Sequence, residues 1–575
     1  MIHDLIIRHG TIVDGSGGTP FEGDVAISNG RISAVGRIAD RGAEEIDARG
    51  HVVTPGFVDI HTHYDGQATW EQAMEPSSAH GVTTVVAGNC GVGFAPCRPQ
   101  DQDRLIRLME GVEDLPFPVL KAGLPWNWES FPDYLDSLTS RQFAIDIGLQ
   151  LPHAALRVYV MGERGANREP ATPADIAAMA ALAGEAMQAG AMGFSTSRTL
   201  NHRTADGEPT PTLTAGEDEL MGIALAMGRT GKGVLQFVSD FADPDAEFAM
   251  LRRLCAASGR PLSFSLAQSP RAPEGWRHLL GLLSDATAAG LPMKAQVAAR
   301  PVGVLLGLDL TLNPFSLHPD WQAMATAPLA ERQRALADPA FVARLCANPP
   351  PPGNALGTAL LHRWGDMYQL GSPPNYEPAP DTSLAAQAMR RGVPFEQVAA
   401  EWLLPGAPGA LNQTSGMIYV PFLNFADGDL DAVHAMLAHP DTLPGLSDGG
   451  AHVGMICDGS FPTSLLTHWV RDRVGARLPL QHLVKRQARD TALAVGLADR
   501  GQIAPGLRAD LNIIDLAGLR LGSPRVAHDL PGGGRRLLQD AQGYVATIVK
   551  GVVTRRHDQA TGALPGRLLR GTGAG

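Results

Sequence analysis

The segment TPGFVDIHTH (residues 54–63) decides how the rest of this sequence is interpreted. A Pro-Gly turn signal precedes a short apolar run, which ends in His61 and His63 at positions i and i+2. Alternate residues of a strand share a face, so both imidazoles are expected to point the same way. Two nitrogen ligands at the end of one strand are a suitable start for a metal site. A pair of hydrogen-bonded structural histidines is the alternative, and the surrounding sequence has to distinguish the two.

The 575-residue chain has 44% apolar and 18% charged residues, which is typical of a large, well-buried enzyme with more than one domain. Its net charge of −12 argues against a nucleic acid or an anionic membrane as a partner. Five scattered cysteines, an odd number, favour a reducing compartment over a disulfide framework. The chain opens without a signal-like segment and has no apolar run of about 18 residues, so we expect a cytoplasmic protein without membrane spans.

Short strand patterns separated by turn signals occupy residues 1–55, with a hairpin signal at Ser28-Asn29-Gly30. Patterns of the same character recur near the C-terminus. Strands at this density predict a small β-sandwich, with residues 1–55 as its first part and residues 499–575 as its second part. The region between them, residues 56–498, would then be one continuous domain inserted between the two halves.

Apolar strand patterns alternate with helical patterns through the middle of the chain. The expected strands span 82–87, 144–149, 191–194, 233–237, 261–266 and 291–297, and the expected helices span 172–189, 215–227, 243–258, 460–473 and 481–495. Repeated strand–helix units predict an α/β protein with a parallel sheet, and their number favours a (β/α)8 TIM-type barrel over an open sheet. No GxGxxG or GxxxxGK[ST] motif follows a strand pattern, which argues against nucleotide binding.

Residues from about 300 to 430 interrupt this rhythm. They contain the proline-rich run NPPPPG (348–353), several aromatic residues and only short helical patterns. We interpret them as an insertion after the seventh barrel strand, at the end of the barrel that carries catalytic loops. A lid, an oligomer contact and a surface elaboration are the alternatives for its role.

Two further segments place reactive side chains at predicted strand ends. Cys90 lies in the glycine turn GNCGVG (88–93) after the strand at 82–87, and Asp448 lies in LSDGGAH (446–452), where the last barrel strand should end. The carboxyl ends of parallel strands meet at one rim, so both side chains would face the two histidines. A buried apolar thiol is the alternative for Cys90, and an Asx turn or N-cap is the alternative for Asp448.

Longer segments make the sequence recognisable: they are PGFVDIHTHYDGQ (55–67), GVTTVVAGNCGVGFAP (81–96), WNWESFPDYLDSL (126–138), HAALRVYVMGERG (153–165), AMQAGAMGFSTS (186–197), SDGGAH (447–452) and GQIAPGLRADLNIID (501–515). Across both ends and most of the middle, the chain resembles the amidohydrolase superfamily, and within it the N-acyl-D-amino-acid deacylase (D-aminoacylase) group. The resemblance implies a (β/α)8 barrel that carries a β-sandwich. It also implies metal-assisted hydrolysis of a linear amide.

The resemblance further implies the ligands of a first metal ion, which are His61, His63, Cys90 and Asp448. Imidazole, thiolate and carboxylate donors together favour Zn²⁺, and we expect one ion per chain. Hydrolysis would then use Asp448 as the general base toward water. Asp65 and Asn89, which lie close to the ligands in sequence, are candidates for orienting them.

The histidines of that group's second metal site are missing here. The corresponding segments are LQFVSD (235–240) after the fifth strand and SLAQ (265–268) after the sixth, and the group's arginine-bearing phrase after the eighth strand is replaced by GMICDG (454–459). We therefore consider other residues for substrate binding, namely Arg198, Arg203, Gln268 and Arg300. For polarising the substrate carbonyl we consider His153 and His202. An ordinary structural or loop role is the alternative for each of the six.

These features predict a metal-dependent hydrolase that cleaves a carbon–nitrogen bond in a small-molecule amide, such as an N-acyl amino acid, with assembly into a homo-oligomer left open. A cyclic amidohydrolase or deaminase of the same superfamily is one alternative, although no lysine at the fourth strand end suggests a carbamylated bridge. A non-catalytic barrel that binds a metal or a ligand is another, because the second-metal histidines are missing.

Overall fold

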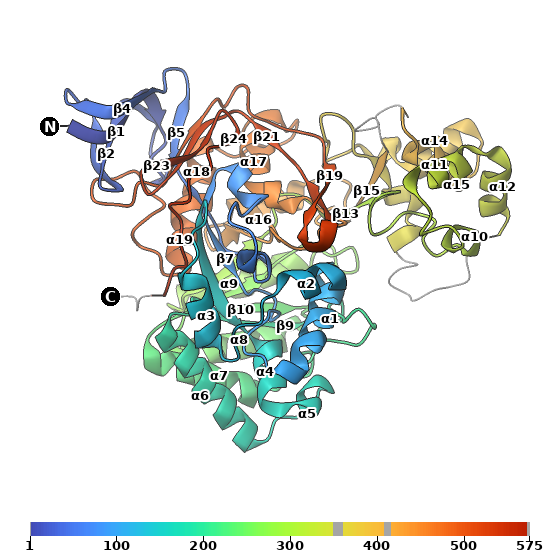
Figure 1. Ribbon diagram of the computed structural model, residues 1–575, viewed down its shortest axis with the longest axis horizontal. Helices are drawn as coiled ribbons and strands as arrows, with labels where there is room; N and C mark the ends of the chain where they lie inside the picture. Colours follow the sequence, from blue (N-terminus) through green and yellow to red (C-terminus); the bar gives the residue numbers. More distant parts are fainter. Residues whose placement is uncertain (1, 349–359, 407–415, 572–575) are drawn as a thin grey trace.

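The computed structural model describes residues 2–348, 360–406 and 416–571. Figure 1 shows a barrel of strands and helices, a β-sheet domain that contains both blue and red strands, and a mainly helical subdomain that projects to one side. The chain therefore enters the barrel from the sheet domain and returns to it afterwards. Most of the proline-rich run at 348–353 lies outside the described residues.

Eight parallel strands form the barrel, in the order β16-β12-β11-β10-β9-β8-β7-β6. They are β6 (Phe57–Asp59), β7 (Val82–Ala87), β8 (Asp146–Pro152), β9 (Gly193–Arg198), β10 (Val234–Ser239), β11 (Leu262–Ser265), β12 (Met293–Val297) and β16 (Thr442–Pro444). A parallel bridge between Thr62 and Gly449 closes the seam between the first and last strands, and the His63 amide donates to the Gly449 carbonyl at 2.8 Å. The predicted barrel is confirmed, and each of the six predicted strands overlaps an observed one.

Helices cover the outside of the barrel. They are α1 (Gln102–Glu113), α2 (Phe117–Gly123), α3 (Phe131–Thr139), α4 (His153–Met161), α5 (Glu163–Ala166), α6 (Pro173–Ala189), α7 (Glu217–Thr230), α8 (Pro244–Ser258), α9 (Gly275–Ala288), α16 (Asp431–Ala438), α17 (Phe461–Leu466), α18 (Leu480–Lys485) and α19 (Thr491–Ala494). Thr172 caps α6 through a capping box. The helices predicted at 460–473 and 481–495 are found, but each contains a π-helical segment, η7 (Thr467–Asp472) or η8 (Arg486–Asp490).

The two chain ends build one nine-stranded sheet, in the order β24-β23-β22-β17-β5-β1-β2-β3, with β4 paired to β1. Its strands are β1 (Ile2–Ile12), β2 (Phe21–Ser28), β3 (Arg31–Gly36), β4 (Arg41–Asp47), β5 (Val52–Pro55), β17 (Leu511–Ile514), β22 (Tyr544–Val549), β23 (Val552–Arg556) and β24 (Gln559–Ala560). Antiparallel pairing of β5 with β17 joins the two halves. The predicted β-sandwich of N- and C-terminal segments is confirmed. The predicted hairpin joins β2 to β3, with positive φ at Asn29 (52°) and Gly30 (72°).

A subdomain with its own hydrophobic core follows the seventh barrel strand, within the predicted insertion. Its three-stranded sheet has the order β13-β15-β14, formed by β13 (Val302–Gly307), β15 (Met417–Leu423) and β14 (Tyr368–Gln369). Its helices are α10 (Pro319–Gln322), α11 (Leu329–Ala337), α12 (Pro339–Ala347), α14 (Leu384–Arg391) and α15 (Phe395–Leu403). Because this core is separate from the barrel core, the insertion packs largely on itself.

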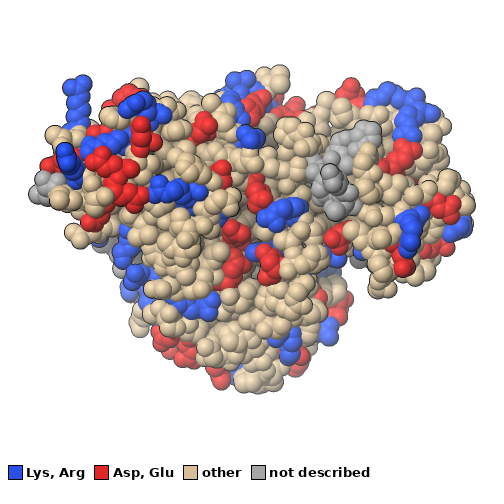
Figure 2. All heavy atoms as spheres, turned by 45° about the horizontal axis from the view of Figure 1, so that its top comes forward, with Lys and Arg blue, Asp and Glu red and all other residues tan. Residues whose placement is uncertain are grey.

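The described part of the chain contains no helix with both the length and the apolar character to cross a membrane. Figure 2 shows acidic and basic side chains interspersed on the visible face. Such mixing differs from the continuous basic surface that is typical of nucleic-acid-binding proteins.

His80 connects the barrel to the C-terminal segment. Its Nδ1 lies 2.9 Å from Oγ1 of Thr463, and its Nε2 lies 2.8 Å from the carbonyl oxygen of Gln539. Burial lowers the pKa of His80 from 6.5 to about 3. Between these two pH values the unfolded chain takes up a proton that the folded chain excludes, so folding stability falls as the pH decreases through this window.

We expect His80→Gln to weaken this acid sensitivity, because glutamine can still donate to the Gln539 carbonyl but cannot be protonated. Between pH 6.5 and 3, protonation of His80 in the unfolded chain accounts for a loss of wild-type folding stability on the order of 4 kcal/mol. The measurement is the urea midpoint of unfolding across this pH range for both proteins. Identical pH dependences would contradict the assignment.

Candidate metal centre

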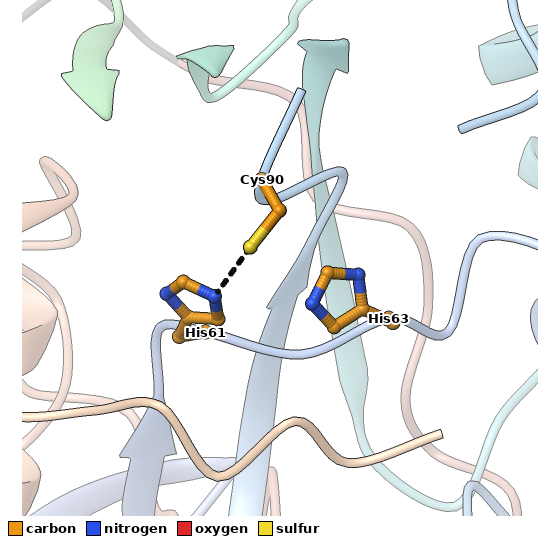
Figure 3. Close-up of side chains that lie close together, drawn as sticks. All are labelled: His61, His63 and Cys90. Atoms are coloured by element: carbon orange, nitrogen blue, oxygen red, sulfur yellow. Dashed lines mark hydrogen bonds between the residues drawn. The ribbon is translucent and has the colours of Figure 1, made fainter. Parts of the chain in front are cut away.

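Three potential ligands converge at the carboxyl end of the barrel. His61 and His63 follow β6, and Cys90 follows β7. Figure 3 shows the three side chains pointing toward one another. Their ligand atoms all lie within 4.8 Å of one another, and Nε2 of His61 is 3.2 Å from Sγ of Cys90. All three residues are buried.

Asp448 joins this cluster from the turn after β16. Its Oδ1 lies 3.5 Å from Nε2 of His61 and 3.5 Å from Nε2 of His63. Ligand atoms bound about 2.0–2.3 Å from a tetrahedral zinc ion are roughly 3.3–3.7 Å apart. The separations around His61, 3.2 Å to sulfur and 3.5 Å to oxygen, are close to that spacing. The four side chains can therefore surround one ion.

Two buried atoms that face each other in the cluster have no hydrogen-bond partner among the described residues, namely Nε2 of His63 and Oδ1 of Asp448. An unpaired buried polar atom costs about 1–3 kcal/mol, so their convergence indicates a further polar group at this point. His61 uses Nδ1 to bond Oε1 of Gln296 at 2.7 Å, which leaves the lone pair of its Nε2 for a cation. This donor set fits a metal ion.

The backbone that carries two of the ligands is left-handed, with φ of 56° at Cys90 and 48° at Asp448. Non-glycine residues adopt this conformation rarely, and their surroundings must stabilise it. Asn89 donates its amide hydrogens to two backbone carbonyls at 3.1 and 2.9 Å. The Asp65 carboxylate accepts from the Gly88 amide at 3.1 Å. Both side chains thus hold the turn that presents Cys90.

Glu113, the last residue of α1, lies behind His63 and is absent from the residues that the sequence suggested. Its side chain is buried, with Oε1 3.4 Å from Nδ1 of His63 and Oε2 3.4 Å from Nε2 of His452. Burial acts to lower the pKa of His63, but the Glu113 carboxylate raises it well above 6.5. In the sequence, Glu113 is marked only by its position on the apolar face of residues 102–113, and this segment is not among the predicted helices.

We expect Glu113→Gln to lower the affinity for the metal by roughly 10–100-fold, because a carboxylate behind a ligating histidine orients the ring and increases its basicity. The measurement is competition for the ion against a chromophoric chelator. Glu110→Gln, one turn earlier on α1, is the control and should bind as the wild type does. Equal affinities in the two variants would show that Glu113 does not support the site.

Binding of an ion requires two of these side chains, His63 and Cys90, to lose a proton. Burial raises the pKa of the Cys90 thiol to about 12, so its thiolate form needs a cation beside it. Burial also acts to raise the pKa of Asp448, but His63 and His61 hold that pKa well below its usual range.

Burial and the neighbouring His452 lower the pKa of His202 to about 3, which keeps this ring neutral near pH 7. His202 thus lies within the electrostatic reach of the cluster.

His153 is held differently. Its Nδ1 is 2.8 Å from Oγ1 of Thr196, its Nε2 is 2.9 Å from Oε1 of Glu219, and its side chain is fully buried. Polarising a substrate carbonyl needs a free ring nitrogen, and both nitrogens of His153 already have protein partners. These contacts instead support a role in connecting β9 to α7.

Gln268 and Arg300 are engaged by protein partners rather than free for a substrate. Nε2 of Gln268 donates to Asp427 at 2.7 Å, and its Oε1 accepts from a backbone amide at 3.1 Å. Arg300 is 2% exposed and donates to Asp458 at 2.8 Å, with its guanidinium 3.6 Å from the ring centre of Tyr376. These contacts hold the insertion and the loop after β16, so they do not support the substrate roles predicted for the two residues.

Arg198 and Arg203 also have other partners. The hydroxyl of Ser195 bonds to the backbone of the Cys90 turn, inside the barrel, so alternation along β9 directs Arg198 outward. There Nη1 of Arg198 lies 3.1 Å from Sδ of Met250 on α8. Arg203 donates to the Gly207 carbonyl at 2.9 Å within its own loop. Neither contact supports the predicted substrate role.

In this parallel barrel, the turns after the first, second and eighth strands bring two histidines, a cysteine and an aspartate to one point. This arrangement places the protein in the class of barrels that can hold a metal ion at the catalytic rim. The chain belongs to the amidohydrolase family, because a sequence model of that family matches residues 44–555.

The chain is similar to several curated deacylases of Alcaligenes xylosoxydans xylosoxydans. Its N-acyl-D-aspartate deacylase is 36% identical over 255 residues, which cover 43% of this chain and 46% of the relative. Its D-aminoacylase is 38% identical over 194 residues, which cover 34% and 37%. The matches thus span less than half of the length of these two relatives. Its N-acyl-D-glutamate deacylase is 26% identical over 520 residues, which cover 89% and 87%.

Solved structures show the same fold. A structure of D-aminoacylase aligns with a TM-score of 0.64 at 24% identity, covering 99% of this chain and 100% of the other. N-acyl-D-glutamate deacylase from Bordetella bronchiseptica aligns with a TM-score of 0.65 at 22% identity and the same coverage. The barrel and its appended β-sandwich are therefore shared with these proteins.

Proposed function

We propose that this chain is a metal-dependent hydrolase of linear amide bonds that removes the acyl group from an N-acyl amino acid, as the names of its curated relatives suggest. The observation that carries the proposal is the convergence of His61, His63 and Cys90 with the carboxylate of Asp448, where Nε2 of His63 and Oδ1 of Asp448 are buried without a hydrogen-bond partner among the described residues. The proposed ion is zinc, which suits imidazole, thiolate and carboxylate donors and is present in the structure of N-acyl-D-glutamate deacylase.

We propose one ion per chain. The positions where a second set of ligands would lie have other tasks: Leu235 is buried in the barrel core, and Oε1 of Gln236 accepts from the Cys90 amide at 3.1 Å. Gln268 is bonded to Asp427 and cannot replace a histidine ligand. The described residues at these positions therefore support a single-ion site.

When bound, the ion supplies Lewis acidity, which lowers the pKa of water and polarises an amide carbonyl. Asp448 is the ligand that water and substrate can reach, because its side chain is 22% exposed whereas those of His61 and His63 are 1% exposed. Its Oδ1 faces the two imidazoles, so Oδ2 is the oxygen that accepts a proton from the attacking water. Asp448 then returns this proton to the leaving nitrogen.

His202 is the proposed hydrogen-bond donor to the carbonyl oxygen. Its Nδ1 pairs with the Ser197 hydroxyl at 2.9 Å, and its Nε2 has no hydrogen-bond partner within the described residues. We propose that the Ser197 hydroxyl donates to Nδ1, which places the hydrogen of the neutral ring on Nε2. A donor fixed in this way stabilises the negative charge that develops on the oxygen during attack.

Hydrolysis assays of the metal-free and zinc-loaded protein test the proposal. The panel contains N-acetyl D- and L-amino acids, hydantoin and dihydrouracil. We expect zinc-dependent release of a free amino acid from at least one N-acetyl substrate and no ring opening. Ring opening alone would favour a cyclic amidohydrolase, and no turnover in a zinc-loaded protein would favour a non-catalytic relative.

The proposed partner is a small-molecule amide, and the proposed location is the cytoplasm. All five cysteines are free thiols, which suits a reducing compartment. Assembly into a homo-oligomer is a further proposal, and sedimentation equilibrium would test it directly.

A further inference from the structure

A cavity lies at the opposite end of the barrel from the metal ligands. Its volume is about 400 Å³. The amino-terminal ends of β10, β11 and β12 line it together with β16, and the segment from α18 to α19 borders it. At the mouth, Leu493 of α19 is 50% exposed. A volume of this size is within the roughly 300–1,000 Å³ range of small-molecule sites.

Three buried glutamines separate this cavity from the metal ligands. Gln150, Gln236 and Gln296 each line the cavity and are each at most 2% exposed. On the side of the metal centre, Gln236 accepts from the Cys90 amide and Gln296 pairs with His61. On the same side, Nε2 of Gln150 donates to Oδ1 of Asn89 at 2.7 Å. The glutamines thus form one polar layer with the metal centre on one side and the cavity on the other.

The hydrogen-bond network fixes which amide atoms remain free. Gln236 must direct Oε1 toward the Cys90 amide, because that group can only donate. Asn89 directs its NH₂ group to two carbonyls, so its Oδ1 can accept only from Nε2 of Gln150. The remaining atoms, Nε2 of Gln236 and Oε1 of Gln150, are buried and have no partner among the described residues. One unpaired donor and one unpaired acceptor therefore belong to the same cavity lining.

The rest of the cavity is apolar or already neutralised. Apolar side chains dominate its wall, and they are Ile60, Val234, Leu262, Leu443, Leu493, Ala494 and Val495. The charged groups at its border have partners: Lys294 lies 2.8 Å from Asp441, while Arg486 and Lys485 share Asp490, at 3.1 and 3.8 Å. A ligand with a net charge would lose hydration there without gaining a free counter-charge.

We propose that this cavity is a second ligand site, which binds a small neutral molecule with a carboxamide head and a short aliphatic body. The carbonyl oxygen of such a head accepts from Nε2 of Gln236, and its N–H donates to Oε1 of Gln150. The aliphatic body lies against Val234, Leu262 and the residues of α19. The site does not depend on the proposed hydrolysis, because none of the metal ligands lines it.

Titration of the full-length, zinc-loaded protein with hexanamide tests this site, with ligand-observed NMR as the readout and hexanoate as the charged control. We expect saturable binding of hexanamide and at least about tenfold weaker binding of hexanoate. Leu493→Trp should fill the mouth and weaken hexanamide binding by about tenfold or more. Leu225→Trp, a partly exposed leucine on α7 outside the cavity, should bind hexanamide as the wild type does.

A crystal structure of the protein soaked with hexanamide gives a second, independent readout. Density for the amide between Gln150 and Gln236 would support the proposal. Density for water alone, or a wild-type protein that does not bind hexanamide up to its solubility limit, would overturn it. Binding that Leu493→Trp leaves unchanged would also overturn it, because the amide would then occupy another site such as the metal centre.

Discussion

Replacing Asp448 with asparagine is expected to lower kcat by about 10³–10⁴-fold on any N-acyl substrate that the wild type accepts. Asparagine keeps the shape of the side chain and an oxygen that can face the ion, but it cannot take a proton from water at neutral pH. Metal content should therefore change much less than turnover. The two measurements are steady-state hydrolysis and elemental analysis of the same preparation.

The matched control is Asp245→Asn, the same change at an exposed carboxylate on α8 that pairs with His278. It should leave kcat within about threefold of the wild type, as is usual for a surface change outside the barrel. Wild-type turnover in the Asp448 variant would contradict the assignment of Asp448 as general base. Loss of both the metal and the turnover would make Asp448 chiefly a ligand.

Cys90→Ser is expected to lower the affinity for zinc on the order of a hundredfold or more, and turnover at limiting zinc should fall with it. The change replaces sulfur by a harder, less acidic hydroxyl, which is a poor ligand for zinc. The turn itself should persist, because Asn89, Asp65 and Gln236 hold its backbone and do not contact the thiol. Zinc competition titration measures the affinity, and circular dichroism reports on the fold.

Cys97→Ser is the control for this experiment. Cys97 is also buried and lies seven residues further along the same segment, but its thiol donates to the Arg98 carbonyl and not to the metal cluster. It should bind zinc as the wild type does. Equal zinc affinity in both variants would remove Cys90 from the ligand set.

The fold was largely predictable because its signals are periodic and local. Strand and helix patterns alternate at the spacing of a βαβ unit, and the cap at Thr172 marks the start of α6. The hairpin between β2 and β3 follows from Asn29-Gly30, which supplies the two positive φ angles that this turn needs. Pairing of β5 with β17 joins residues more than 450 positions apart, and the similar strand character of the two termini was sufficient to suggest it.

The metal ligands could be proposed from the sequence because each follows a recognisable strand, but the residues around them could not. Glu113 reaches His63 from a helix with no motif, and Gln296 reaches His61 from the middle of β12. Such contacts depend on how distant elements pack, which no local pattern encodes. The partners of the predicted arginines could not be foreseen for the same reason, since Arg300 has a suitable position in the chain but is paired with Asp458.

His61, His63, Cys90 and Asp448 are proposed to hold one zinc ion. Zinc K-edge absorption spectroscopy, combined with elemental analysis of protein purified without chelators, tests this most directly. We predict one zinc per chain with one sulfur ligand at about 2.3 Å and nitrogen or oxygen ligands at about 2.0–2.2 Å. A coordination shell without sulfur, or two tightly bound ions per chain, would contradict it.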